Sequence, residues 1–139
     1  MTTPVWVLLG FAGWTLLILL LSVGVYRWGL ILTGRRRIAQ FPADAAGGAA
    51  WYQRATRAHA NCIENLPVYA AIVLAARCAQ IDDSFLNVLA CTLLAARVIQ
   101  SLVHICFVQT NTVVSVRFSF FFVQFICMAA MGIHIAMAA

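Results

Sequence analysis

Long apolar stretches alternate with short polar ones along this sequence. Four apolar stretches cover residues 5–31, 54–79, 85–107 and 113–137. Each is long enough for an α-helix to cross the hydrocarbon core of a bilayer, which takes roughly 20 residues. The connections after the second and third stretches are short, so neighbouring helices should run antiparallel. The pattern predicts a single all-α domain over residues 1–139, a four-helix transmembrane bundle with up-down topology.

Composition supports a membrane protein and argues against a nucleic-acid-binding one. Hydrophobic residues make up 64% of the chain and charged residues only 9%, and the mean hydropathy is +0.95. A soluble domain carries about 25% charged residues. The net charge of +5 comes from nine arginines. These lie in or beside apolar segments, so no soluble basic face is left for nucleic acid.

The distribution of arginine predicts the orientation in the membrane. Six arginines lie in or beside the loop over residues 33–53: Arg27, Arg35, Arg36, Arg37, Arg54 and Arg57. The positive-inside rule places this loop in the cytoplasm and both termini outside. We expect a multi-pass protein of the bacterial plasma membrane. Near the outer end of the second helix, we expect Arg77 to reach toward Asp82 or Asp83.

Polar residues of the second predicted helix gather on one face. At 100° per residue, one arc of about 100° holds a set of charged and amide side chains: Arg54, Arg57, Asn61, Glu64 and Asn65. His59 falls on the opposite side of the helix. Charged groups at membrane depth are costly and usually face a bundle interior or a wet cavity. This face therefore predicts a polar site inside the bundle.

The third and fourth predicted helices carry weaker polar faces. Arg97, Gln100, Ser101 and His104 share one arc, and Arg117 shares a face with Gln124. Glu64 could simply pair with Arg97 or Arg57, and His104 could be a packing residue. Four intramembrane arginines nevertheless face one carboxylate. This surplus of positive charge predicts an anionic ligand that enters from the cytoplasmic side.

Neither the cysteines nor the histidines indicate a metal site. The five cysteines all lie in apolar segments and include no CxxC pair, which favours a packing role for them. No set of His, Cys, Asp and Glu has metal-ligand spacing. We therefore predict no metal.

The segment from Arg57 to Pro67 resembles the second helix of the MAPEG family, membrane-associated proteins in eicosanoid and glutathione metabolism. That helix typically reads Arg-x-His/Gln-x-Asn-x-x-Glu, then an aromatic or polar residue, then proline. This chain has Arg57, His59, Asn61, Glu64, Asn65 and Pro67 at those places. The stretch from Arg97 to His104 is similar to the family's third helix. Length and helix number also fit.

This resemblance implies a homotrimer that binds glutathione as a co-substrate at subunit interfaces. Arg57, Asn61 and Glu64 would hold the charged ends of glutathione, and His59 would reach a neighbouring subunit's site. Arg54, Asn65, Arg97, Gln100 and His104 would complete the pocket, with Arg36 or Arg37 contacting the ligand. Several members have tyrosine where this chain has Asn65, Gln100 and His104. Thiolate-activating members carry an arginine near the start of the fourth helix, where the nearest arginine here is Arg117.

The function predicted from these features is glutathione-dependent transfer or peroxide reduction, on apolar electrophiles or lipid hydroperoxides that enter from the bilayer. Arg117 is the candidate catalytic residue, because a nearby guanidinium lowers the pKa of a thiol. Two alternatives stay open. One is a non-catalytic membrane scaffold of the same fold, and the other is a small proton-coupled transporter that uses Glu64.

Overall fold

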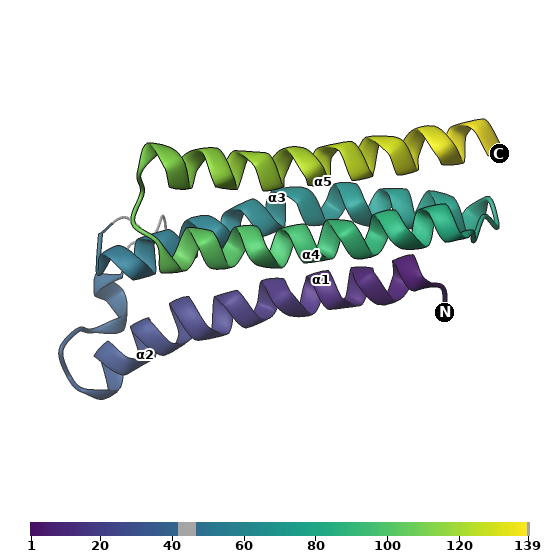
Figure 1. Cartoon of the computed structure of the whole chain (residues 1–139). Helices are drawn as coiled ribbons and strands as arrows, with labels where there is room; N and C mark the ends of the chain where they lie inside the picture. The colour runs from purple at the N-terminus through teal and green to yellow at the C-terminus, as the bar shows by residue number, and fades with distance from the viewer. Residues whose placement is uncertain (42–46, 139) are drawn as a thin grey trace.

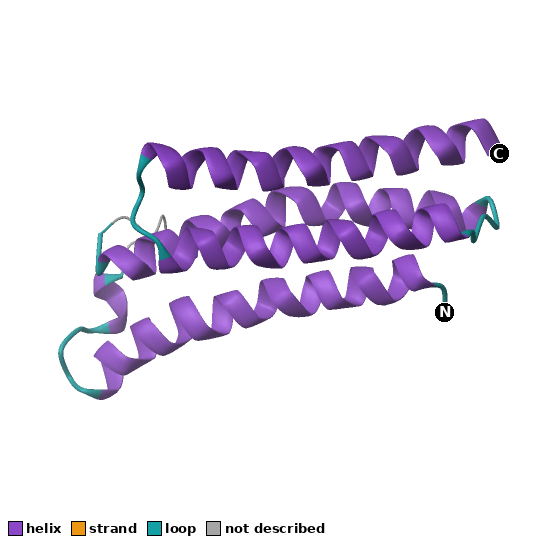
Figure 2. Cartoon of the chain, viewed as in Figure 1, coloured by secondary structure: helices purple, strands orange, loops and turns teal. Residues whose placement is uncertain are grey.

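The structure is a computed structural model that describes residues 1–41 and 47–138. Within these residues it contains helices and loops and no β-strand (Figure 2). Four helical rods lie side by side (Figure 1). The first consists of α1 (Thr3–Leu19), the π-helix η1 (Leu20–Gly24) and α2 (Val25–Leu32), and the others are α3 (Ala50–Cys78), α4 (Ser84–Cys106) and α5 (Asn111–Ala138). The loop before α3 holds a short 3-10 helix, η2 (Ile38–Gln40).

The two chain ends lie at the same end of the bundle as the turn between α3 and α4 (Figure 1). The long loop before α3 and the connection between α4 and α5 lie at the opposite end. α4 packs against α1, α3 and α5, and α3 also packs against α1. The second helix begins at Ala50, earlier than the predicted residue 54. Within the predicted loop over residues 33–53, residues 42–46 lie outside the described residues.

Three of the helical rods are long and apolar enough to cross a membrane. They are Thr3–Leu32, Ser84–Cys106 and Asn111–Ala138, with mean hydropathies of 2.2, 1.8 and 2.0 over their most apolar stretches. The chain is therefore an integral membrane protein. α3 is equally long at 29 residues but is much less apolar, because it carries the polar face predicted from the sequence.

A proline begins the first rod, and two buried hydroxyl groups within it bond to its own backbone. Pro4 lies in the first turn of α1, where its missing N–H costs no hydrogen bond. The hydroxyls of Thr15 and Ser22 are buried, and each donates to the carbonyl four residues earlier. Such bonds satisfy polar groups within an apolar segment. Neither hydroxyl therefore needs a partner from another helix.

Gly34 ends this rod. Its φ of +69° lies in the left-handed region that favours glycine. The N–H of Gly34 donates to the carbonyl of Ile31 at 3.0 Å, and the N–H of Arg35 donates to that of Leu30 at 3.0 Å. This pair of bonds is a Schellman motif, which satisfies the last carbonyls of a helix and turns the chain away from its axis.

The core lies where α1, α3, α4 and α5 meet. Its largest fully buried apolar or aromatic side chains are Phe11, Tyr69, Leu86, Leu93 and Met131. The ring centroids of Phe11 and Tyr69 are 6.3 Å apart, and the Tyr69 hydroxyl donates to the carbonyl of Pro4 at 3.0 Å. This bond ties the start of α1 to the middle of α3.

At the end of the bundle that holds the termini, Asp83 links two helices. Its Oδ1 accepts from the N–H of Leu86 at 2.9 Å and so caps the start of α4. Its Oδ2 lies 2.6 Å from Nε2 of His134 on α5. Arg77 is exposed, and the ion pair of Asp83 is with His134 rather than with Arg77. The expectation that Arg77 extends toward Asp82 or Asp83 stays a prediction.

Candidate functional site

A polar pocket of about 200 Å³ opens at the end of the bundle that holds the long loop. It lies between the first turns of α3, the last turn of α4, the α4–α5 connection and the start of α5. The lining residues are Ala50, Gln53, Arg54, Arg57, His104, Phe107, Val108, Gln109 and Arg117. The three helices α3, α4 and α5 thus supply one set of polar side chains.

The pocket is strongly positive. Arg54, Arg57 and Arg117 line it together with His104, and none of its lining residues within 1–41 and 47–138 is acidic. The Arg54 Nε donates to the carbonyl of Ile105 at 3.0 Å, which fixes this side chain across the gap between α3 and α4. The Nε of Arg117 is buried and has no hydrogen-bond partner among the described residues. Three like charges beside an unpaired buried donor favour an anionic ligand.

A chain of amide groups lies beneath the pocket and connects α4 to α5. The Arg97 Nη1 donates to Oε1 of Gln100 at 3.1 Å, and the Gln100 Nε2 donates to the carbonyl of Arg117 at 2.9 Å. Gln124 donates to the same Oε1 of Gln100 at 3.1 Å. Gln100 and Gln124 are both buried. Gln100 thus binds the backbone of Arg117, Gln124 supports Gln100, and neither glutamine lines the pocket.

Arg97 lies in the bundle core, apart from the pocket. Its side chain is 1% exposed, and its guanidinium carbon lies 5.4 Å from the ring centre of Phe11. Its Nε and Nη2 have no hydrogen-bond partner in the described structure. Ser101 donates to the Arg97 carbonyl at 2.9 Å, and the Cys62 sulfur lies 3.7 Å from the Ser101 hydroxyl. Arg97 is therefore a buried cation that rests on an aromatic ring.

The remaining polar residues of α3 continue the Arg57 face beyond the pocket. Arg57 and Glu64 are exposed, and within the described part of the chain Glu64 forms no ion pair. Asn65 is largely buried and donates to the carbonyl of Asn61 at 2.8 Å and to its side-chain oxygen at 3.2 Å. The single chain thus leaves the two charged side chains Arg57 and Glu64 of this predicted face uncovered.

Three other predicted site residues lie elsewhere in the single chain. His59 is on a different side of α3, where its Nδ1 lies 3.2 Å from the carbonyl of Thr15 on α1. Arg36 and Arg37 are exposed beyond the end of α2 and do not line the pocket. The structure therefore brings Arg54, Arg57, His104 and Arg117 together and leaves these three apart.

Sequence reasoning missed Gln53, Phe107 and Gln109 as pocket residues. Gln53 lies one turn before Arg57 on α3, so an earlier helix start would have placed it near the polar face. Phe107 and Gln109 lie in or beside an irregular connection, where helical periodicity gives no signal. Among the described residues, no group of His, Cys, Asp and Glu could hold a metal ion.

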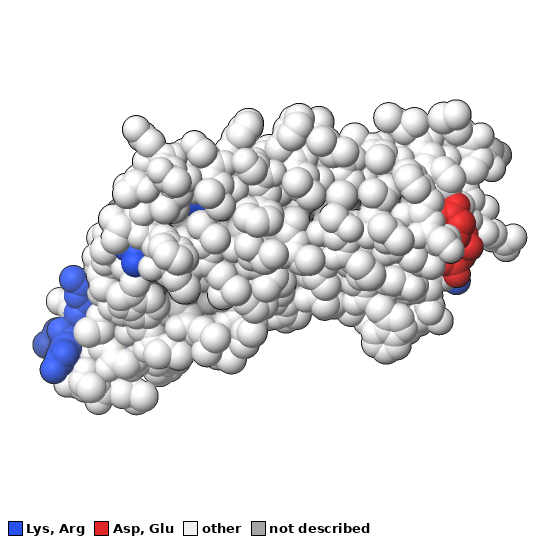
Figure 3. All heavy atoms as spheres, viewed as in Figure 1, with Lys and Arg blue, Asp and Glu red and all other residues white. Residues whose placement is uncertain are grey.

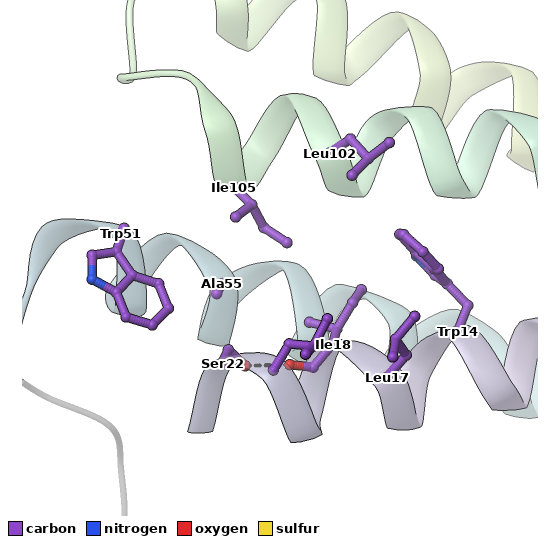
Figure 4. Close-up of a pocket in the computed structure, with 9 residues that line it drawn as sticks. Trp14, Leu17, Ile18, Ser22, Trp51, Ala55, Leu102 and Ile105 are labelled. Atoms are coloured by element: carbon purple, nitrogen blue, oxygen red, sulfur yellow. Dashed lines mark hydrogen bonds between the residues drawn. The ribbon is translucent and has the colours of Figure 1, made fainter. Parts of the chain in front are cut away.

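A second cavity, of about 220 Å³, is apolar (Figure 4). α1, η1, α3 and α4 enclose it. The lining residues are Trp14, Leu17, Ile18, Leu21, Ser22, Trp51, Ala55, Leu102 and Ile105. The polar pocket and this cavity lie on either side of the contact between Arg54 and Ile105.

On the face of the molecule shown in Figure 3, positive and negative side chains gather mainly at opposite ends. In Figure 3 the blue arginine atoms gather mainly at the end that holds the long loop, and the red acidic atoms lie at the opposite end. The polar pocket belongs to the positive end. The fold and the pocket define the class of protein as a multi-helix membrane protein with a cationic pocket at one end.

The chain belongs to the MAPEG family, whose sequence profile matches residues 11–137. The match covers nearly the whole chain, so it supports a glutathione-related membrane function in general. No curated protein and no solved structure matches the chain significantly.

Proposed function

We propose that the protein is a glutathione-dependent transferase or peroxidase that acts on apolar electrophiles or lipid hydroperoxides. The observation that carries this proposal is the convergence of Arg54, Arg57, Arg117 and His104 on one pocket, where the described residues supply no acidic side chain. Glutathione is an anionic tripeptide with two carboxylates, and guanidinium groups bind carboxylates with paired, charge-assisted hydrogen bonds. Membership of the MAPEG family supports the same ligand.

A neighbouring subunit would complete this site in a homotrimer. The polar face of α3 supports that arrangement, because Arg57 and Glu64 are exposed in the single chain and exposed charges on a membrane helix need partners. In the trimer Asn61, Glu64 and Asn65 would bind the amino end of glutathione, and His59, Arg36 or Arg37 would act on a neighbour's site. Arg97 and Gln100 would support the pocket from below.

Arg117 is the proposed catalytic residue. Its Nε is buried without a hydrogen-bond partner in the described structure, so it has a donor to offer a thiolate. A free thiol has a pKa near 8.5 and is mostly protonated at neutral pH, and a guanidinium beside it raises the thiolate fraction. The thiolate sulfur would then bond to the electrophilic carbon of an apolar substrate, and the leaving group would depart with the electron pair.

We also propose that α3 crosses the bilayer with the other helices and that the pocket faces the cytoplasm of a bacterium. The arginine-rich end supports this orientation, since positive loops stay inside. The apolar cavity beside Trp14 and Trp51 supports lateral entry of an apolar substrate from the bilayer. Glutathione would then arrive from water, and the second substrate from lipid.

The test is a glutathione titration of the purified, detergent-solubilised protein, followed by its ultraviolet difference spectrum at the thiolate band. We expect binding and a thiolate signal at neutral pH. Arg57→Gln should weaken binding by about tenfold or more, since a hydrogen bond to a charged group contributes about 1.5–3 kcal/mol. Arg117→Ala should reduce the thiolate signal more than it reduces affinity. Arg77→Gln, at the other end of the bundle, is the matched control and should change neither.

The other outcomes distinguish the two alternatives. Binding without a thiolate signal or turnover would indicate a non-catalytic scaffold that kept the fold. No binding at millimolar glutathione would refute the enzyme, and substrate-driven proton flux in vesicles would then identify a transporter that uses Glu64.

A further inference from the structure

Three consecutive arginines form a separate charged surface at the end of the first helical rod. Arg35, Arg36 and Arg37 directly follow the Gly34 cap, and all three are exposed. We call them the Arg35–Arg37 patch. They lie at the loop end of the molecule, where arginine is concentrated (Figure 3), and they do not line the polar pocket.

The backbone of this patch is held in place. The N–H groups of Arg35 and Arg36 both donate to the carbonyl of Leu30, at 3.0 and 3.2 Å. The N–H of Arg37 donates to Oε1 of Gln40 at 3.0 Å, and the Arg37 carbonyl accepts from the N–H of Gln40 at 3.0 Å. Because these hydrogen bonds already fix the backbone, binding has to order only the side chains.

Large exposed apolar side chains precede and follow the patch in the sequence. Trp28 is 57% exposed, Leu32 is 80% exposed and Ile38 is 69% exposed. The first two belong to a rod that is apolar enough to cross the membrane. Tryptophan prefers the level of the lipid headgroups, so these residues fix the depth of the patch. The three guanidinium groups then lie at the height of the lipid phosphates.

The charge of the patch is not neutralised by the acidic residues that the structure describes. Among the described residues, the ion pair is the one between Asp83 and His134, which lies at the opposite end of the bundle from the patch. The Arg36 guanidinium lies 5.8 Å from the ring centre of Phe41, which orients it without removing its charge. Guanidinium groups match phosphate oxygens with two parallel hydrogen bonds.

We propose that the Arg35–Arg37 patch binds the phosphate groups of anionic phospholipids in the leaflet that faces the long loop. A guanidinium would recognise the phosphate of a lipid and a free phosphate in the same way. The exposed apolar side chains of Trp28, Leu32 and Ile38 favour a phosphate that is attached to acyl chains. The patch does not line the polar pocket of its own chain. The proposed trimer also places Arg36 or Arg37 at a neighbour's glutathione site, so lipid binding is measured without glutathione.

The test measures lipid binding to the purified protein in a neutral detergent. Phosphatidylglycerol or phosphatidylcholine is titrated, and bound lipid is counted by native mass spectrometry. We expect tighter binding of phosphatidylglycerol. One arginine near an anionic surface contributes about fivefold in affinity, so Arg36→Gln should weaken binding by about that factor and the triple change R35Q/R36Q/R37Q by on the order of 100-fold. Arg77→Gln, which changes one exposed arginine at the opposite end, should have no effect.

Three results would overturn the proposal. The first is equal binding of the two lipids, and the second is an equal effect of Arg36→Gln and Arg77→Gln. The third is full displacement of phosphatidylglycerol by inorganic phosphate at the same phosphate concentration, which would indicate a site for free anions. Size-exclusion profiles and melting temperatures without added lipid show whether the variants fold. If the triple variant misfolds, the comparison of Arg36→Gln with Arg77→Gln decides alone.

Discussion

The contact between Phe11 and Arg97 should contribute measurably to stability, and a double-mutant cycle can isolate it. The ring is 0% exposed, the guanidinium is 1% exposed, and 5.4 Å separates the guanidinium carbon from the ring centre. A cation–π contact in such a desolvated place contributes about 1–2 kcal/mol. Phe11→Leu should lose this contact and also about 1 kcal/mol of packing. In the protein with the native Arg97, Phe11→Leu should therefore lower the free energy of unfolding by about 2–3 kcal/mol.

When Arg97→Met is already present, Phe11→Leu should lower the free energy of unfolding only by the packing contribution of about 1 kcal/mol. Arg97→Met alone removes a buried charge whose Nε and Nη2 lack partners in the described structure, so we expect it to be neutral or stabilising. The assay is reversible unfolding in mixed micelles with increasing denaturing detergent, with all four variants measured. Phe122→Leu, at a ring that is 51% exposed, is the control and should not couple to Arg97. An equal cost of Phe11→Leu in both backgrounds would refute the contact.

Three further predictions concern the helix ends and the core. Hydrogen bonds from the N–H of Leu86 and, second, from His134 lower the pKa of Asp83 in the folded protein. The ionised carboxylate should therefore stabilise the fold at a pH above its ordinary pKa. This stabilisation should be lost as the pH falls below about 4 and the carboxylate takes up a proton. Asp83→Asn should therefore flatten the dependence of melting temperature on acid pH, and an unchanged profile would contradict this. Gly34→Ala places a Cβ at a φ of +69° and should cost about 1–2 kcal/mol in unfolding measurements, while Gly29→Ala, inside α2, should not. Tyr69→Phe removes the hydrogen bond between α3 and α1 and should cost about 0.6 kcal/mol and at most about 1.7; a stabilising effect would show that the bond contributes nothing.

The sequence alone was enough for the helices and for the polar face of α3. Apolar stretches long enough to cross a bilayer leave the backbone one way to satisfy its own hydrogen bonds, which is to form helices. The spacing of Arg54 and Arg57 placed both on one side of α3, because helical geometry is the same in any context. Both now line one pocket. The motif around Asn61 and Glu64 led to the right family.

Only the tertiary structure decided which polar residues meet. Arg97 and Arg117 look equivalent in the sequence, yet Arg97 is buried against Phe11 and Arg117 lines the pocket. Arg97 packs against α1, whereas the bond from Gln100 to the carbonyl of Arg117 joins α4 to α5 beside the pocket. Helical periodicity places a residue around its own helix, but it does not say which residue of the next helix lies opposite. That choice comes from packing and hydrogen bonding between helices, so it appears only when they are assembled.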